Sequence, residues 1–305
     1  MGIPCPYPYP GEMLNGTLAR ISRRAGLPLS EIERLSGYHV RFRHDGAFCM
    51  ELLAFFGDKF EGRRSIWELA CSNTIFPMVM PFAAEKTIKQ YKSLTRQSIR
   101  PDGRFYNIGW RKLRLKSRLC FCKECFKEQL DRYCENYWKL IWQIPLADVC
   151  EIHGTPLTQT SLPGSHSTRV FDPTDIDNSA CRELEVTEHS CMLTKTIATL
   201  LANRRIAGRD RWHDIISRLA KNAGISDVKA YRWNNGVFIT SPTLADQCIA
   251  FWGENWLAQN FSQILSSSTI QLGNYWLKYL ILIKALDKDP SLSFDRYISQ
   301  ITSKC

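Results

Sequence analysis

Apolar residues recur along much of the chain at the spacing of helices that bury one face. Residues 47–94 and 242–287 are the most apolar of these stretches. Residues 111–118 differ, because basic residues alternate there with Leu113 and Leu115, which is the period of a half-buried strand. The pattern predicts a mainly α-helical chain with a few short strands near its middle.

A helix-turn-helix arrangement is predicted near the N-terminus. An apolar face over residues 14–21 marks a first helix, and the Ala-Gly-Leu sequence at 25–27 marks a turn. The second helix is expected to take Ser30 as its N-cap, with Glu33 completing a capping box, and to end at Gly37. The same pattern also describes ordinary helical hairpins that bind no DNA.

Two further helical segments follow from the same reasoning. Residues 212–233 form a second helix-turn-helix-like passage, with a turn at 222–224 and Ser226 as the next N-cap. A shorter amphipathic helix, ended by Pro145, is predicted from one apolar stripe. The residues of that stripe are Cys134, Tyr137, Trp138, Ile141 and Trp142.

The length of 305 residues accommodates about two or three domains. Residues 155–185 are rich in Ser, Thr, Pro and Asp and are the best candidate for a linker. We therefore expect a helical domain with the helix-turn-helix over residues 1–110 and a zinc-finger domain over 111–160. A helical C-terminal domain with the second helix-turn-helix-like element is expected over 161–305.

The charge balance points to a polyanionic partner such as DNA. Forty Lys and Arg face thirty Asp and Glu, which gives a net charge of +10. The alternative is a basic surface that meets only solvent. The candidate nucleic-acid contacts on the first hairpin and the basic strand are Arg20, Arg23, Arg24, Arg34, Arg111, Lys112, Arg114, Lys116 and Arg118.

Two close pairs of soft ligands give the strongest chemical signal. They are Cys122-x-x-Cys125 and Cys150-x-x-His153. Together they supply four ligands, the full tetrahedral set of a structural zinc site, whereas a catalytic zinc keeps one position open. The alternative is a set of buried or disulfide-forming cysteines. The sequence thus predicts a zinc ion that holds the fold.

Several functional classes lack support in the sequence. The N-terminus has no secretory pattern, so we expect a reducing, cytoplasmic setting, and the apolar run 275–286 is too short to cross a membrane. Phosphate-binding loops, dinucleotide fingerprints, nucleophile elbows and HExxH motifs are missing, which argues against an enzyme. An active site formed by carboxylates that are distant in sequence but close in the fold would leave no such motif.

The chain resembles the TniQ/TnsD family of transposition target-selection proteins. The resemblance is carried by YPGEMLNGTLAR, NTIFPMVMPF, CKEC and YCENYWKLIWQIPLADVCEIHGTPL, in that order. It implies that the family's zinc ligands fall on Cys122, Cys125, Cys150 and His153. The family often has proline after the first Cys of each pair. Lys123 and Glu151 stand there in this chain, which we expect to be a surface change that leaves ligation intact.

The resemblance also implies a function. A short TniQ-like protein would be a non-enzymatic adaptor of a Tn7-like transposon. It would link target DNA, through a CRISPR effector complex such as Cascade or directly, to the AAA+ regulator TnsC and so recruit the transposase. The alternative is a sequence-specific attachment-site DNA-binding protein of TnsD type. A metal-dependent nucleic-acid enzyme is the third hypothesis, and a full ligand set argues against it.

Overall fold

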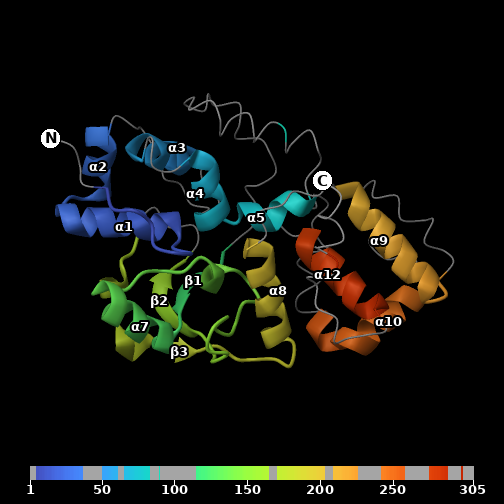
Figure 1. The fold of residues 1–305 in the computed structure, drawn as a ribbon. Coiled ribbons are helices and arrows are strands. Elements are labelled where there is room, and N and C mark those ends of the chain that lie inside the picture. The colour runs from blue at the N-terminus through green and yellow to red at the C-terminus, as the bar shows by residue number, and fades with distance from the viewer. Residues whose placement is uncertain are drawn as a thin grey trace. The chain divides into compact units, whose positions relative to one another are not determined.

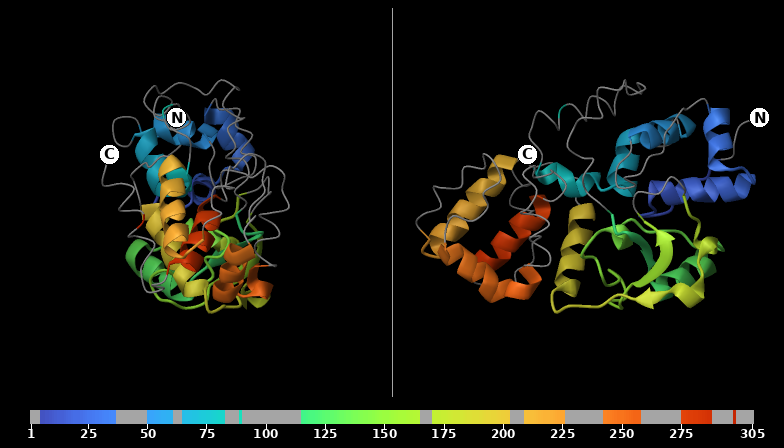
Figure 2. Two further views of the ribbon diagram at one scale, coloured as in Figure 1. Left: turned by 90° about the vertical axis from the view of Figure 1, so that its right-hand side faces the viewer. Right: turned by 180° about the vertical axis from the view of Figure 1, so that it is seen from behind.

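The computed structural model describes residues 5–36, 50–60, 65–82, 89, 115–164, 170–202, 209–225, 242–257, 275–287 and 297. The chain divides into two compact units. The first unit is Met1–Met78 with Lys89–Arg204, and the second is Val79–Ile88 with Arg205–Cys305. Figures 1 and 2 show a mainly helical chain with one small sheet, as predicted. The division into domains at residues 1–110, 111–160 and 161–305 stays a prediction.

Two helices joined by a glycine turn begin the first unit. Helix α1 spans Leu14–Ala25 and α2 spans Leu29–Ser36. Gly26 ends α1 with a φ of 64°, a left-handed conformation that glycine adopts without the steric cost of a Cβ. The apolar face predicted over residues 14–21 is buried.

The predicted cap of the second helix is wrong. Helix α2 begins at Leu29, so Ser30 lies inside its first turn. The carbonyl oxygen of Pro28 accepts the first hydrogen bonds, from the backbone N–H groups of Glu31 and Ile32. Glu33 lies in α2, but its side chain is outside the described part of the structure.

The next segment continues as short helices. They are α3 (Met50–Lys59), α4 (Ile66–Asn73), α5 (Phe76–Val79) and the 3-10 helix η1 (Met80–Phe82). A capping box between Ser65 and Glu68 starts α4. The two prolines in residues 73–82 predict a loop between helices, but the prediction is wrong, because Pro77 lies in the first turn of α5, where its missing N–H is tolerated.

The centre of the first unit is a small antiparallel sheet with the order β1-β2-β3. Its strands are β1 (Arg118–Phe121), β2 (Thr158–Pro163) and β3 (Arg182–Glu183). Of the strand predicted at 111–118, residues 115–117 are not in a strand and Arg118 begins β1, while residues 111–114 lie outside the described residues. Helix α7 (Lys123–Tyr133) follows β1, and the rings of Phe121 and Phe126 stack between them.

A glutamine side chain closes the outer edge of β1. The backbone N–H of Cys120 donates to Gln143 Oε1 at 3.0 Å, and Gln143 Nε2 donates to the Cys120 carbonyl oxygen at 2.8 Å. Gln143 belongs to the 3-10 helix η4 (Ile141–Gln143) and is fully buried. Its amide thus satisfies both backbone groups of Cys120, which a further strand at this edge would otherwise use.

The amphipathic helix predicted over residues 134–142 is wrong, although its aromatic side chains are buried as expected. Cys134 is exposed and adopts a left-handed φ of 57° that ends α7. The chain then pairs with residues 5–13, the N-terminal arm, since the N–H of Met13 donates to the Trp138 carbonyl and the N–H of Leu140 donates to the Gly11 carbonyl. The aromatic side chains of this segment are therefore buried without forming the single apolar face of a helix.

The remaining α-helices of the described residues are α8 (Ser190–Ala202) in the first unit and α9 (Arg209–Asn222), α10 (Pro242–Trp252) and α12 (Tyr275–Leu286) in the second. Helix α12 packs against α9 and α10, and its described side chains are buried except that of Ala285, which is half-buried. Gly224 has a positive φ at the predicted turn, but Ser226 lies outside the described residues. Among the helices that are described, none is long and apolar enough to cross a bilayer.

Candidate metal centre

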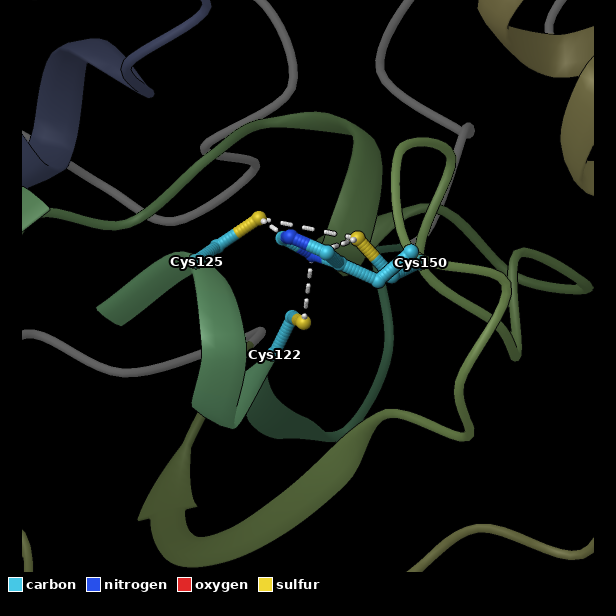
Figure 3. Close-up of side chains that lie close together, drawn as sticks. Cys122, Cys125 and Cys150 are labelled. Atoms are coloured by element: carbon cyan, nitrogen blue, oxygen red, sulfur yellow. Dashed lines mark hydrogen bonds between the residues drawn. The ribbon is translucent and has the colours of Figure 1, made fainter. Parts of the chain in front are cut away.

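The four predicted ligands come together from two tight turns. Cys122 is the N-cap of α7, and Cys125 lies in its first turn. Cys150 and His153 belong to a turn closed by the Gly154 N–H, which donates to the Cys150 carbonyl oxygen at 2.9 Å. Gly154 has a φ of 70°, a conformation that favours glycine at this point. Figure 3 shows the three sulfurs pointing to a common centre.

The distances between the ligand atoms fit a tetrahedral ion. Nδ1 of His153 lies 3.5 Å from Cys122 Sγ, 3.4 Å from Cys125 Sγ and 3.5 Å from Cys150 Sγ. Cys125 Sγ and Cys150 Sγ are 3.6 Å apart. Zinc bonds of about 2.3 Å to sulfur and about 2.0–2.1 Å to nitrogen would place two sulfurs about 3.8 Å apart, and a sulfur and a nitrogen about 3.6 Å apart. The cluster can therefore hold a metal ion.

The thiols interact strongly with one another. Hydrogen bonds from the Cys125 and Cys150 side chains lower the pKa of Cys122. The pKa of Cys150 is raised to about 11, first by its hydrogen bond to Cys122. One thiolate is thus stabilised at the expense of its neighbours. A bound cation would take the place of the remaining protons, since metals bind the thiolate form.

Carboxylates of α7 orient the second ligand turn. Nε2 of His153 lies 3.1 Å from Glu128 Oε1, which leaves Nδ1 directed at the sulfurs. The hydroxyl of Thr155 donates to Glu124 Oε2 at 3.2 Å and lies 3.7 Å from Cys122 Sγ. These contacts join the turn at Cys150 to α7 without using the metal.

A half-buried ion pair also contacts the cluster. Lys139 Nζ lies 2.9 Å from Glu151 Oε1 and 3.7 Å from Cys125 Sγ. Burial is the largest single effect and lowers the pKa of Lys139, but the charge and hydrogen bond of Glu151, with smaller contributions from Cys125 and Tyr137, together raise it, so the net shift is upward. Lys123 is exposed, as expected, whereas the Glu151 side chain is only 17% exposed. The expectation that both positions are surface changes is therefore wrong for Glu151.

Lys139, Glu151 and Glu128 were not predicted as site residues. Of these three, Glu151 could have been suspected from the sequence, because an acid stands directly after Cys150, where the family often has proline. Lys139 and Glu151 also line a hollow of about 500 Å³ in the first unit, together with residues of the N-terminal arm, α4 and α8.

Arg20, a predicted nucleic-acid contact, lies in the interior. Its guanidinium donates to both oxygens of Glu12, at 3.2 and 2.8 Å, and to the Tyr7 carbonyl oxygen at 2.8 Å. The side chains of Arg20 and Glu12 are 2% and 0% exposed. We correct the prediction for Arg20, because a phosphate cannot reach this guanidinium in the folded unit.

The other arginines of the first hairpin are more exposed. Arg23 and Arg24 both pair with Glu135, at 2.7 and 2.5 Å, and Arg23 also pairs with Asp172. Arg34 is the most exposed of them, and its ion-pair partner among the described residues is Glu31, three positions earlier on the same helix. Nucleic-acid contact by these three residues stays a prediction.

The predicted basic strand is only partly described. Lys116 is mostly buried, donates to the Ala147 carbonyl oxygen and pairs with Asp148 at 3.2 Å. Arg118 is exposed and donates to the Ser161 carbonyl oxygen. Arg111, Lys112 and Arg114 lie outside the described residues. Of this strand, Arg118 is the described side chain that is best placed to meet a ligand from solvent.

The four candidate ligands lie in a region whose sequence matches a known protein family. The sequence model of the TniQ family matches residues 4–157, which include all four candidate ligands. The chain is also similar to the transposon Tn7 transposition protein TnsD of Escherichia coli, at 25% identity over 160 residues. That alignment covers 49% of this chain and 30% of TnsD. Because the family match extends over half of the chain, this protein belongs to the TniQ family.

Proposed function

We propose that this chain is a non-enzymatic target-selection adaptor of a Tn7-like transposon. It would link target DNA to the AAA+ regulator TnsC and thereby recruit the transposase. The observation that carries the proposal is the TniQ match over residues 4–157, which spans the arm, the first hairpin and the four converging ligands. The similarity to the Tn7 protein TnsD supports the same transposition role.

The metal in this proposal is zinc, and its role is structural. Three thiolates and one imidazole are a soft donor set with the tetrahedral spacing that zinc prefers. All four positions are filled by protein atoms, so no open position is left for water or substrate. This argues against a metal-dependent nucleic-acid enzyme and for an ion that joins α7 to the turn before β2.

The described arginines favour an adaptor over a direct DNA-binding protein of TnsD type. Arg20 is buried against Glu12, while Arg23 and Arg24 share the carboxylate of Glu135. A hairpin whose cations are matched by acids presents a weak field to phosphate. Target choice would then come from a partner, such as the CRISPR complex Cascade with its guide RNA.

A binding experiment separates the two interpretations. The purified chain would be titrated onto random DNA and onto attachment-site DNA, and separately onto immobilised TnsC and Cascade. The adaptor interpretation expects capture of TnsC and Cascade with weak, sequence-independent DNA binding. Nanomolar binding to one DNA site without a guide-RNA partner would favour the TnsD-type interpretation, and failure to capture TnsC would contradict the adaptor.

Neutralising the exposed arginines should flatten the salt dependence of DNA binding. For the double variant Arg34→Gln and Arg118→Gln, we expect the slope of log K against log salt to fall by about one unit for each lost phosphate contact. Lys195→Gln, an exposed residue of α8, is the control. A slope equal to that of the unmodified chain would assign both arginines to solvent or to a protein partner.

A further inference from the structure

We infer that Lys139 and Glu151 act as an outer-sphere pair that sets how tightly the Cys3His cluster holds its metal. The inference rests on the metal centre proposed above, but it concerns two residues that are not ligands. Lys139 would be a positioning residue that donates to one thiolate, and Glu151 would hold it in place.

The geometry supports a specific contact. Lys139 Nζ lies 3.7 Å from Cys125 Sγ, within the range of a hydrogen bond to sulfur, and 2.9 Å from Glu151 Oε1. The second oxygen of Glu151 accepts from Trp142 Nε1 at 3.1 Å, and Trp142 is fully buried. Lys139 and Glu151 are only 13% and 17% exposed, so neither is a flexible surface side chain.

The positive charge of Lys139 would offset the negative charge of the cluster when a metal is bound. Three thiolates, one neutral imidazole and a divalent ion carry a net charge of −1, and the cysteines are almost fully buried. A buried charge is costly unless it is paired or hydrogen-bonded. The ammonium group of Lys139 supplies both, because it donates to Cys125 Sγ and places a positive charge beside the cluster.

The pair also connects the two halves of the site. Cys125 belongs to α7, whereas Glu151 directly follows the ligand Cys150. Lys139 therefore bridges the first ligand pair to the second through side chains alone. Its backbone forms an isolated bridge with Glu12, so the same residue fixes the metal site to the start of α1. Loss of the lysine side chain should loosen the ligand set even where all four ligands remain.

Zinc affinity of variants of the full chain tests the inference. The protein would be stripped of metal and titrated with zinc in competition with a chromophoric chelator. Lys139→Met keeps the length of the side chain without its charge, and we expect zinc affinity to fall roughly 10- to 100-fold, as for other outer-shell substitutions. Lys139→Arg keeps a charged donor and should recover most of the affinity, which loss of packing alone would not explain.

Lys123→Met is the matched control. Lys123 lies between the ligands Cys122 and Cys125 and, like Lys139, forms an ion pair, but its partner is the exposed Glu183. Zinc affinity should be unchanged in this variant. Equal affinities of Lys139→Met and the unmodified chain would overturn the inference, as would an equal loss in Lys123→Met. If the unmodified chain binds no zinc, the proposed metal centre itself fails, which is a different outcome.

A second measurement serves if Lys139→Met does not fold. Glu151→Gln keeps the shape of the side chain but removes the charge that anchors Lys139. With zinc bound, we expect an alkylating reagent to modify Cys125 several-fold faster than in the unmodified chain, because a thiolate that loses its donor becomes more nucleophilic. Mass spectrometry of the Cys125 peptide gives the rate, and an unchanged rate would contradict the inference.

Discussion

Cys125→Ser is expected to release the metal and to unfold the segment 115–164. Serine is a poor ligand for zinc, and structural zinc contributes roughly 10 kcal/mol or more to small folds. That is as large as the whole stability of a typical domain, about 5–15 kcal/mol. Metal analysis of the purified variant and a thermal melt should therefore both change. The same result is expected for Cys150→Ser, since both sulfurs face one centre.

Cys134→Ser provides the control for this prediction. Cys134 lies in the same segment and directly follows α7, but it is exposed and stands outside the ligand cluster. The metal content and melting temperature of the Cys134→Ser variant should match those of the unmodified chain. A Cys125→Ser protein that keeps a full equivalent of metal, or melts at an unchanged temperature, would rule out a structural role for the ion.

The second large effect is expected at Arg20. Arg20→Met leaves the carboxylate of Glu12 buried without its partner, and breaking a buried ion pair in this way costs about 3–5 kcal/mol. Arg20 also stacks over the ring of Tyr9 at 4.3 Å and lies 3.4 Å from Glu135, so several contacts are lost together. Chemical denaturation of both proteins measures the difference in unfolding free energy.

The pH dependence of this variant gives an independent check. Burial raises the pKa of Glu12, and hydrogen bonds from Arg20 oppose that rise. A carboxyl whose pKa is raised by folding favours the folded state at low pH, and that contribution is lost as the pH rises above its unfolded pKa. Without Arg20 the pKa should rise further. The difference in stability between the variant and the unmodified chain should therefore become smaller as the pH is lowered from neutral toward the unfolded pKa of a glutamate, about 4.3.

A double variant separates the ion pair from simple packing. In Glu12→Gln with Arg20→Met, neither side chain carries a charge, so the penalty for an unpaired buried carboxylate disappears. We expect it to be more stable than Arg20→Met alone. If the double variant is less stable by the sum of both single effects, Glu12 and Arg20 act independently, and the ion pair is not what holds the arm to α1.

The ligand set could be predicted because its chemistry is local in sequence. Cys122 and Cys125 are separated by one turn of chain, as are Cys150 and His153, so each pair is organised by its own backbone. Only the meeting of the two pairs is a tertiary event. The first two helices were also predictable, since a one-sided apolar face and the glycine at position 26 are local features.

The helix predicted over residues 134–142 shows where local patterns fail. Trp138 and Trp142 have helical spacing, yet both are fully buried within an irregular segment. The pairing of Lys139 with Glu12 comes from far along the chain and competes with helix formation. Hydrophobic spacing reports burial well, but it does not say whether one neighbour or several provide it.

The fate of the basic residues could not be read from the sequence either. Glu135 is more than one hundred positions away from Arg20, Arg23 and Arg24, yet the fold brings all three to its carboxylate. A net charge of +10 predicts the sign of the partner but not which cations remain available. That depends on which acids the fold places beside them.

The amide of Gln143 has a consequence for association with other chains. A strand at the edge of a sheet offers bare peptide groups, and neighbouring proteins can extend the sheet there, which is a common route to aggregation. At Cys120 those groups are already occupied from within the same molecule. A peptide that adds a strand to this edge must therefore first displace the Gln143 amide from Cys120.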